Sequence, residues 1–142
     1  SHSWRPQSND VEPCDMSAIS DYLEARIINF WLRGTSYTPP AAVYLALFTT
    51  VTTDAGGTEV TGGSYARQAV TFSAPGATDG LTSNTGVLTY AGMPACTVLA
   101  GGVFDAVSGG NMLVHGLFSA ARIVGVGKSF VVGIGEATFV IR

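Results

Sequence analysis

The sequence predicts a mainly β protein, a jelly-roll-like antiparallel β-sandwich preceded by one N-terminal α-helix and an extended N-terminal arm. Residues 42–48 (AVYLALF) are almost all apolar, as in a strand that is buried on both faces. Residues 65–72 (YARQAVTF) alternate between two faces, as in a half-buried strand. Further short runs of this kind follow, separated by glycine-rich turn signals, and this pattern is typical of a sandwich.

The strands are expected to follow Pro39 and Pro40, because two consecutive prolines exclude a continuing helix. A series of short strands in one chain favours the jelly-roll type of sandwich. The predicted strands cover residues 42–49, 65–73, 86–91, 97–105, 112–118, 122–125, 129–132 and 137–141.

One helix is predicted, over residues 17–33. Apolar side chains recur there at steps of three or four residues, and acidic residues occupy the first turns. Gly34 follows the last turn, as at many helix ends. Trp31 and its neighbours widen the apolar stripe beyond what one core face needs, so this edge of the helix is expected either to face a partner or to cover the open end of the sandwich.

Residues 1–15 are polar, with Trp4 and Val11 as their main apolar side chains, and cannot fold alone. They are predicted to form an arm that lies on the body, on a sister subunit or on another protein. Residues 16–142 are predicted to form a single domain, since the chain length of 142 residues suits one core. The predicted partner contacts are Trp4, Val11 and Trp31.

Charged residues make up only 12% of the chain, against about a quarter in an average soluble domain. So little charge predicts that part of the surface is covered by copies of the chain, most simply as a homotrimer, or by another protein. The alternative is an uncomplexed all-β domain whose surface is rich in serine and threonine.

The net charge of −3 and the scattered basic residues argue against nucleic-acid binding. No apolar run reaches the 18 to 20 or so residues that cross a bilayer, and residues 1–15 lack the apolar centre of a signal peptide. No membrane partner is therefore expected, and the protein is expected to be made and assembled in the cytoplasm.

Cys14 and Cys96 lie far apart in the sequence, with no second pair. Two free thiols are expected in a reducing cytosol, although a bridge between the arm and the body is the alternative. A four-ligand zinc site is not available from two cysteines, and no metal or cofactor is predicted.

The run GVGKS at residues 125–129 resembles the end of a phosphate-binding loop. The loop's earlier glycine would fall at position 122, which is Arg122, and the residues that follow alternate like a strand instead of forming a helix. The run is therefore interpreted as a hairpin turn with Lys128 in solvent.

No catalytic residues are predicted, and the chain is not expected to be an enzyme. His115 lies between apolar residues and is expected to be a hydrogen-bonded group where two strands meet. Asp54, Asp79 and Asp105 are expected to stabilise turns, so an acidic pair of the glycosidase kind would arise only through tertiary contacts. The aromatic residues are spread along the strands as core residues.

Three segments carry a resemblance to a known family: RGTSYTPP at residues 33–40, GGSYARQAVTF at residues 62–72 and FDAVSGGNMLVHG at residues 104–116. In this order they resemble small tailed-bacteriophage virion proteins described as tail fibre or head decoration proteins. The resemblance covers residues 16–142. Because such proteins usually begin near the equivalent of Met16, residues 1–15 are either an added arm or a segment foreign to the natural protein.

The resemblance implies a structural protein of the phage particle, located in the virion. The first hypothesis is a non-enzymatic capsid decoration (cement) protein that binds the major capsid protein, or another virion protein, and stabilises the head. The alternative is a tail fibre, receptor-binding or adaptor module that contacts the host surface. The sequence contains neither heptads nor β-helix repeats for a fibre shaft, which favours the first hypothesis.

Overall fold

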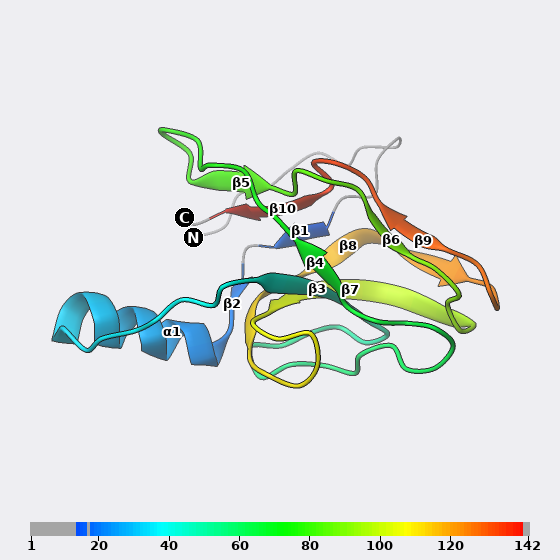
Figure 1. Cartoon of the computed structure of the whole chain (residues 1–142), viewed down its shortest axis with the longest axis horizontal. Coiled ribbons are helices and arrows are strands. Elements are labelled where there is room, and N and C mark those ends of the chain that lie inside the picture. Colours follow the sequence, from blue (N-terminus) through cyan, green and yellow to red (C-terminus); the bar gives the residue numbers. More distant parts are fainter. Residues whose placement is uncertain (1–13, 17, 141–142) are drawn as a thin grey trace.

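A computed structural model describes residues 14–16 and 18–140 and confirms a mainly β fold with one helix (Figure 1). Trp4 and Val11, two of the predicted partner contacts, lie outside the described residues. The elements in chain order are β1 (Cys14–Met16), β2 (Ala18–Ile19), α1 (Asp21–Ile27), the π-helical turn η1 (Ile28–Leu32), β3 (Val43–Phe48), β4 (Gln68–Val70), β5 (Leu81–Ser83), β6 (Leu88–Tyr90), β7 (Cys96–Phe104), β8 (Met112–Val124), β9 (Phe130–Val132) and β10 (Ala137–Val140).

The large sheet has the strand order β4-β3-β7-β8-β1-β10-β5, and β2 pairs with β8 outside this path. The strands β6 and β9 form a separate two-stranded sheet. Tyr90 of β6 joins the two sheets, because its hydroxyl donates a hydrogen bond of 2.8 Å to the carbonyl of Leu45 in β3. The core lies between the sheets and contains side chains of both, with Phe130 of β9 packed edge-on against Phe118 of β8.

One pairing departs from the predicted antiparallel arrangement: β1 runs parallel to β10, with Cys14 opposite Ala137. The physical reason is that β1 does not pair with its neighbours in the sequence. It fills the gap between β8 and β10, and its direction is set by the antiparallel contact of Cys14 with Phe118. Residues 14 and 15, which the sequence analysis assigned to the arm, therefore belong to an interior strand.

Gly116 allows this insertion. A Cβ atom at this position would lie 2.2 Å from the backbone oxygen of Asp15, so a residue with a side chain would push β1 away from β8. Gly116, the last residue of the FDAVSGGNMLVHG segment, is thus needed for the packing of β1 against β8.

The helix begins at Asp21, later than the predicted start at residue 17. Ala18–Ile19 form β2 against β8, and Ser20 then caps the helix by accepting a 3.1 Å hydrogen bond from the Leu23 amide. The Ser20 hydroxyl also donates to the Met112 carbonyl, which fixes the helix start to the sheet. Tertiary pairing with β8 thus overrides the helical pattern of the first residues.

Three strand predictions also differ from the structure. The two segments predicted at residues 112–118 and 122–125 form the single strand β8, and the segment predicted at residues 65–73 is regular only in β4. β5 was not predicted because it is short and only half-buried. It is held by antiparallel pairing with β10.

Both cysteines are free: Cys14 is buried in the sheet and Cys96 is partly exposed. Burial raises the pKa of the Cys14 thiol to about 12, so almost no thiolate forms near neutral pH.

Cys14 should therefore be a reporter of sheet opening. At pH 8 we expect iodoacetamide to modify Cys96 in the folded chain and to leave Cys14 intact, whereas both should react in denaturant. Peptide mass spectrometry measures the two rates, and a Cys96→Ser variant isolates Cys14. Modification of Cys14 in the folded chain as fast as that of Cys96 would contradict the buried position of β1.

Candidate functional site

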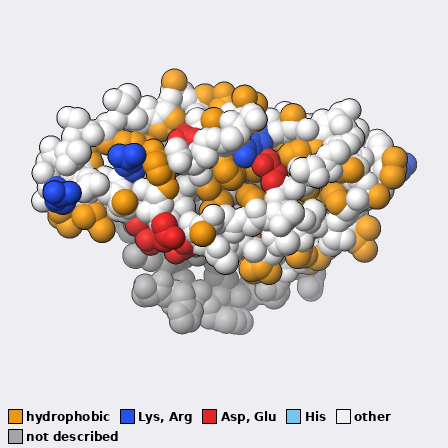
Figure 2. Space-filling view, turned by 90° about the horizontal axis from the view of Figure 1, so that it is seen from below, with side chains coloured by type: hydrophobic (Ala, Val, Ile, Leu, Met, Phe, Trp, Pro, Cys, Tyr) orange, Lys and Arg blue, Asp and Glu red, His pale blue; other side chains and the backbone are white. Residues whose placement is uncertain are grey.

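A groove crosses one face of the molecule between the loop that follows β3, the loop that joins β7 to β8, and the start of α1. Its volume is about 590 Å³. Figure 2 views the molecule from this side and shows charged side chains around hydrophobic atoms in a hollowed centre. The side chains that the groove presents include Asp21, Phe48, Asp54, Glu59, Arg67 and Asn111.

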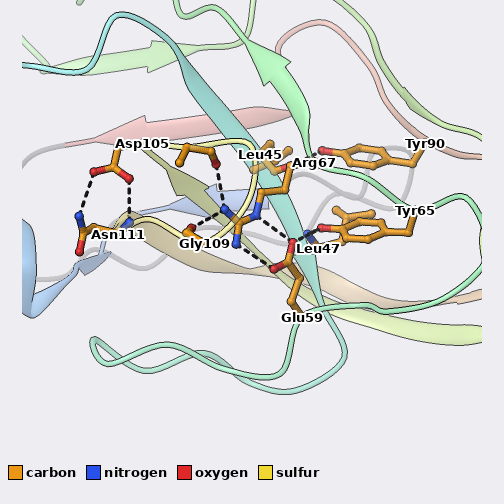
Figure 3. A network of polar contacts seen from close by, with 10 residues as sticks. Leu45, Leu47, Glu59, Tyr65, Arg67, Tyr90, Asp105, Gly109 and Asn111 are labelled. Atoms are coloured by element: carbon orange, nitrogen blue, oxygen red, sulfur yellow. Dashed lines mark hydrogen bonds and ion pairs between the residues drawn. The ribbon is translucent and has the colours of Figure 1, made fainter.

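Arg67 ties the walls of the groove together (Figure 3). Its guanidinium forms a two-pronged ion pair with Glu59, through Nε at 3.0 Å and Nη2 at 2.9 Å. Its Nη1 donates to the carbonyls of Ala106 and Gly109 at 2.9 and 2.8 Å. The same group lies 3.8 Å from the ring centre of Phe104. One buried cation, 7% exposed, thus joins both loops to the end of β7.

Tyr65 and Tyr90 bond to strand β3 next to the Arg67–Glu59 pair. The Tyr65 hydroxyl donates to Glu59 at 2.6 Å and accepts from the Leu47 amide at 3.0 Å, and its ring stacks on that of Tyr90. Burial, and then the hydrogen bond to Glu59, raise the pKa of Tyr65, so the phenol stays protonated. Tyr65 therefore orients Glu59 toward Arg67.

The loop between β7 and β8 is held by hydrogen bonds between its two ends, Asp105 and Asn111. The Asp105 carboxylate accepts from the backbone and side-chain nitrogens of Asn111 at 2.7 and 3.1 Å, as predicted for a turn aspartate. Gly109 and Gly110 adopt φ of 64° and 70°, and a Cβ at Gly110 would lie 2.5 Å from Asp105 Oδ1. The two glycines let the loop bring its carbonyls to Arg67.

His115 has the predicted structural position, on β8 between β7 and β2. It is buried, with Nδ1 2.8 Å from the Thr52 hydroxyl and Nε2 2.9 Å from Asp54 Oδ1. Asp54 was predicted to stabilise its own turn. Instead, it joins its loop to β8 through His115, which holds the carboxylate at the groove.

Three acidic side chains gather near the start of α1, and two of them, Asp21 and Asp54, line the groove. Carboxylate oxygens of Asp21, Glu24 and Asp54 lie within 4.8 Å of one another. The Asp21 amide donates to the Asp54 carbonyl at 3.2 Å, which holds the helix start against the loop. Within residues 14–16 and 18–140, neither Asp21 nor Glu24 forms an ion pair with a basic side chain, and the nearby Arg26 lies over the ring of Tyr22.

The run GVGKS forms a turn with Lys128 exposed, as predicted, but the turn does not close a hairpin. It joins β8 to β9, and these strands belong to different sheets. Gly127, with φ of 73°, donates to the Met93 carbonyl, which ties the turn to another loop. A strand follows it, so the helix that a phosphate-binding loop requires does not occur there.

The sequence analysis missed the Arg67–Glu59 pair and the gathering of acidic side chains. The pair had one signal, because Arg67 lies in GGSYARQAVTF, a segment that carries the family resemblance. The acidic group had none, since Asp54 is about thirty positions from the helix start and only the tertiary fold brings them together.

The fold defines a small, mainly β protein. No helix among the described residues is long and apolar enough to span a membrane. A family model described as "Podophage GP4 fiber I protein gp80" matches residues 18–140. The chain belongs to this family and is therefore a structural protein of the phage virion. A comparison with curated proteins gave no match.

Replacing Arg67 should show how much the groove walls depend on it. We expect Arg67→Met to lower the free energy of unfolding by about 3 kcal/mol, because Glu59 and two carbonyls lose a buried partner. Chemical denaturation measures the loss. The matched control, Arg33→Met, removes the same charge from an exposed side chain and should change stability by less than about 0.5 kcal/mol. Equal stability of the two variants would contradict the role of Arg67.

Proposed function

We propose that the chain is a non-enzymatic subunit of the phage tail fibre, at its tip or as an adaptor, and that it associates through its helical end. The observation that carries the proposal is the exposure of Trp31 and Leu32, which are 74% and 79% exposed. Both belong to η1, at the end of a helical lobe (residues 21–39) that projects from the β body (Figure 1).

The lobe has an apolar surface that water solvates poorly. Ile28 and Phe30 are also exposed, and Phe30 packs edge-on against Trp31 with ring centres 5.1 Å apart. Beside them lies a hollow of about 230 Å³ lined mainly by apolar side chains, among them Tyr37 and Pro39 of the returning segment. Covering apolar surface contributes about 25 cal/mol per Å², so a partner on this lobe gains substantial free energy.

The backbone of the lobe is also unusual. A π-helical turn is rare, and such turns occur frequently at functional sites. Gly34, with φ of 70°, then ends the helix, and the Thr35 amide donates to the Asn29 carbonyl at 2.9 Å. In this helix end Trp31 and Leu32 point to solvent, although large apolar side chains are usually buried in a protein core.

The proposed occupant of the lobe is a second copy of this chain, in a homo-oligomer for which a trimer remains the expected state. The low charge of the chain supports this choice, because it leaves few groups that would oppose close approach of identical surfaces. Burial of Trp31 in such an interface fits the general enrichment of tryptophan among residues that dominate binding.

Capsid decoration is the second candidate. It is supported by the compactness of the described residues, which contain no shaft-like repeat, and an apolar lobe also suits binding to the major capsid protein. The family description favours the fibre. Gold-labelled antibody against this chain on intact particles separates the two: we expect label on the tail fibres, and label over the faces of the head would support decoration instead.

Association through the lobe is tested by Trp31→Ala. We expect the purified chain to form an oligomer and this variant to associate at least about 30-fold more weakly, as for a central interface tryptophan. Analytical ultracentrifugation measures the dissociation constant. The exposed Val87, which lies away from the lobe in sequence, gives the control Val87→Ala, and its association should be unchanged. A wild-type monomer at micromolar concentration would contradict the proposal.

A further inference from the structure

We infer that the helical lobe of one copy binds in the groove of a second copy, with Trp31 inserted and Leu32 beside it. The inference rests on the proposed association through the lobe and adds the surface that receives it. Because the two contact surfaces differ, the contact is heterologous, and such contacts either close into a ring or continue as a filament. A ring of three copies is the closed form that fits the expected trimer.

The floor of the groove is apolar and aromatic, which suits an apolar occupant. Phe48 of β3 and Phe104 of β7 stack there with ring centres 6.1 Å apart, and Met112 belongs to the same cluster. Figure 2 shows hydrophobic atoms in the hollowed centre, with charged side chains around them. An indole on this floor would remove apolar surface of both copies from water.

The groove also has room for the inserted side chains. Its volume of about 590 Å³ lies within the range of about 300 to 1,000 Å³ in which proteins hold small ligands. The glycines Gly56, Gly57, Gly109 and Gly110 line it, so parts of both walls have no side chain that would keep a second backbone at a distance.

The charges of the two surfaces are opposite in sign. Beyond the start of α1, the charged side chains of the lobe are Arg26 and Arg33, and both are exposed. The groove is lined by the carboxylates of Asp21 and Asp54. Of the described side chains that line it, Arg67 alone is basic, and its ion pair already balances its charge. A basic lobe is therefore attracted to an acidic groove.

The lobe cannot enter the groove of its own chain. Asp21 and Tyr22, at the start of α1, line the groove, whereas Trp31 and Leu32 lie at the far end of η1. At about 1.5 Å per residue, the helix holds Trp31 about 15 Å from Asp21. The occupant of the groove must then come from another molecule, and a second copy supplies a lobe for every groove.

Variants that change one surface at a time test the contact. Ala55 is exposed and lines the groove, so Ala55→Arg fills the groove and adds a charge that repels the lobe. We expect this variant of the full chain to associate at least about 30-fold more weakly, as Trp31→Ala does. The matched control Ala77→Arg makes the same change on an exposed turn that does not line the groove, and its association should stay within about twofold.

A mixture of the two variants separates a heterologous contact from a symmetric one. Trp31→Ala keeps an open groove and Ala55→Arg keeps an intact lobe, so one contact can form between them. A single contact lacks the gain from ring closure, so the mixture is measured well above the wild-type dissociation constant. Analytical ultracentrifugation should show a dimer in the mixture and monomers of each variant alone. A mixture that stays monomeric would overturn the inference.

Charge reversal tests the attraction between the lobe and the groove. Arg33→Glu should weaken association at least about tenfold, because it places a carboxylate opposite the acidic groove. Lys128→Glu reverses an equally exposed charge that lies outside the lobe and the groove, and its effect should stay within about twofold. Equal effects of the two variants would contradict the pairing of these surfaces.

The result for Ala55→Arg also distinguishes this inference from the proposed function. A wild-type chain that is monomeric would contradict both. A wild-type oligomer that is lost in Trp31→Ala but unchanged in Ala55→Arg would leave association through the lobe in place. It would overturn the contact with the groove, because the lobe would then bind another surface.

Discussion

The ion pair between Arg67 and Glu59 is the interaction on which the groove face depends. The loop after β3 packs on the core through Val60 and Tyr65, and Arg67 connects this loop to the loop between β7 and β8. One planar cation, stacked on Phe104, satisfies a carboxylate and two carbonyls at once. Tyr65 also donates a hydrogen bond to Glu59 and so orients its carboxylate toward Arg67. The cost of burying a charge is thus offset by a full set of partners.

Patterns that arise within one strand or turn could be predicted from the sequence. The mainly β fold, the apolar strand β3 and the turn held by Asp105 follow from residues close together in the chain. The structural position of His115 could also be predicted, because a histidine between apolar neighbours on a strand requires a partner. Which partner it takes, Thr52 and Asp54, depends on a loop about sixty residues away.

The remaining features depend on contacts that leave no local pattern. β1 is three residues long, and only the gap between β8 and β10 makes it a strand. Residues 18–19 continue a helical spacing but gain more from pairing with β8. The acidic group at the groove brings together two elements whose residues, taken separately, resemble an ordinary first helical turn and an ordinary loop.

The insertion of β1 also sets the order in which the molecule can fold. Its parallel partner β10 lies 123 positions further along the chain, as the pairing of Cys14 with Ala137 measures. During synthesis β1 can pair with β8 first, but the β1 edge that faces β10 stays unpaired until β10 has left the ribosome. Closing so long a loop is entropically costly, which makes the last step of folding slow compared with local hairpins. In an infected cell, newly made chains would pass through a stage with an open sheet edge, during which pairing with neighbouring chains competes with completion of the fold.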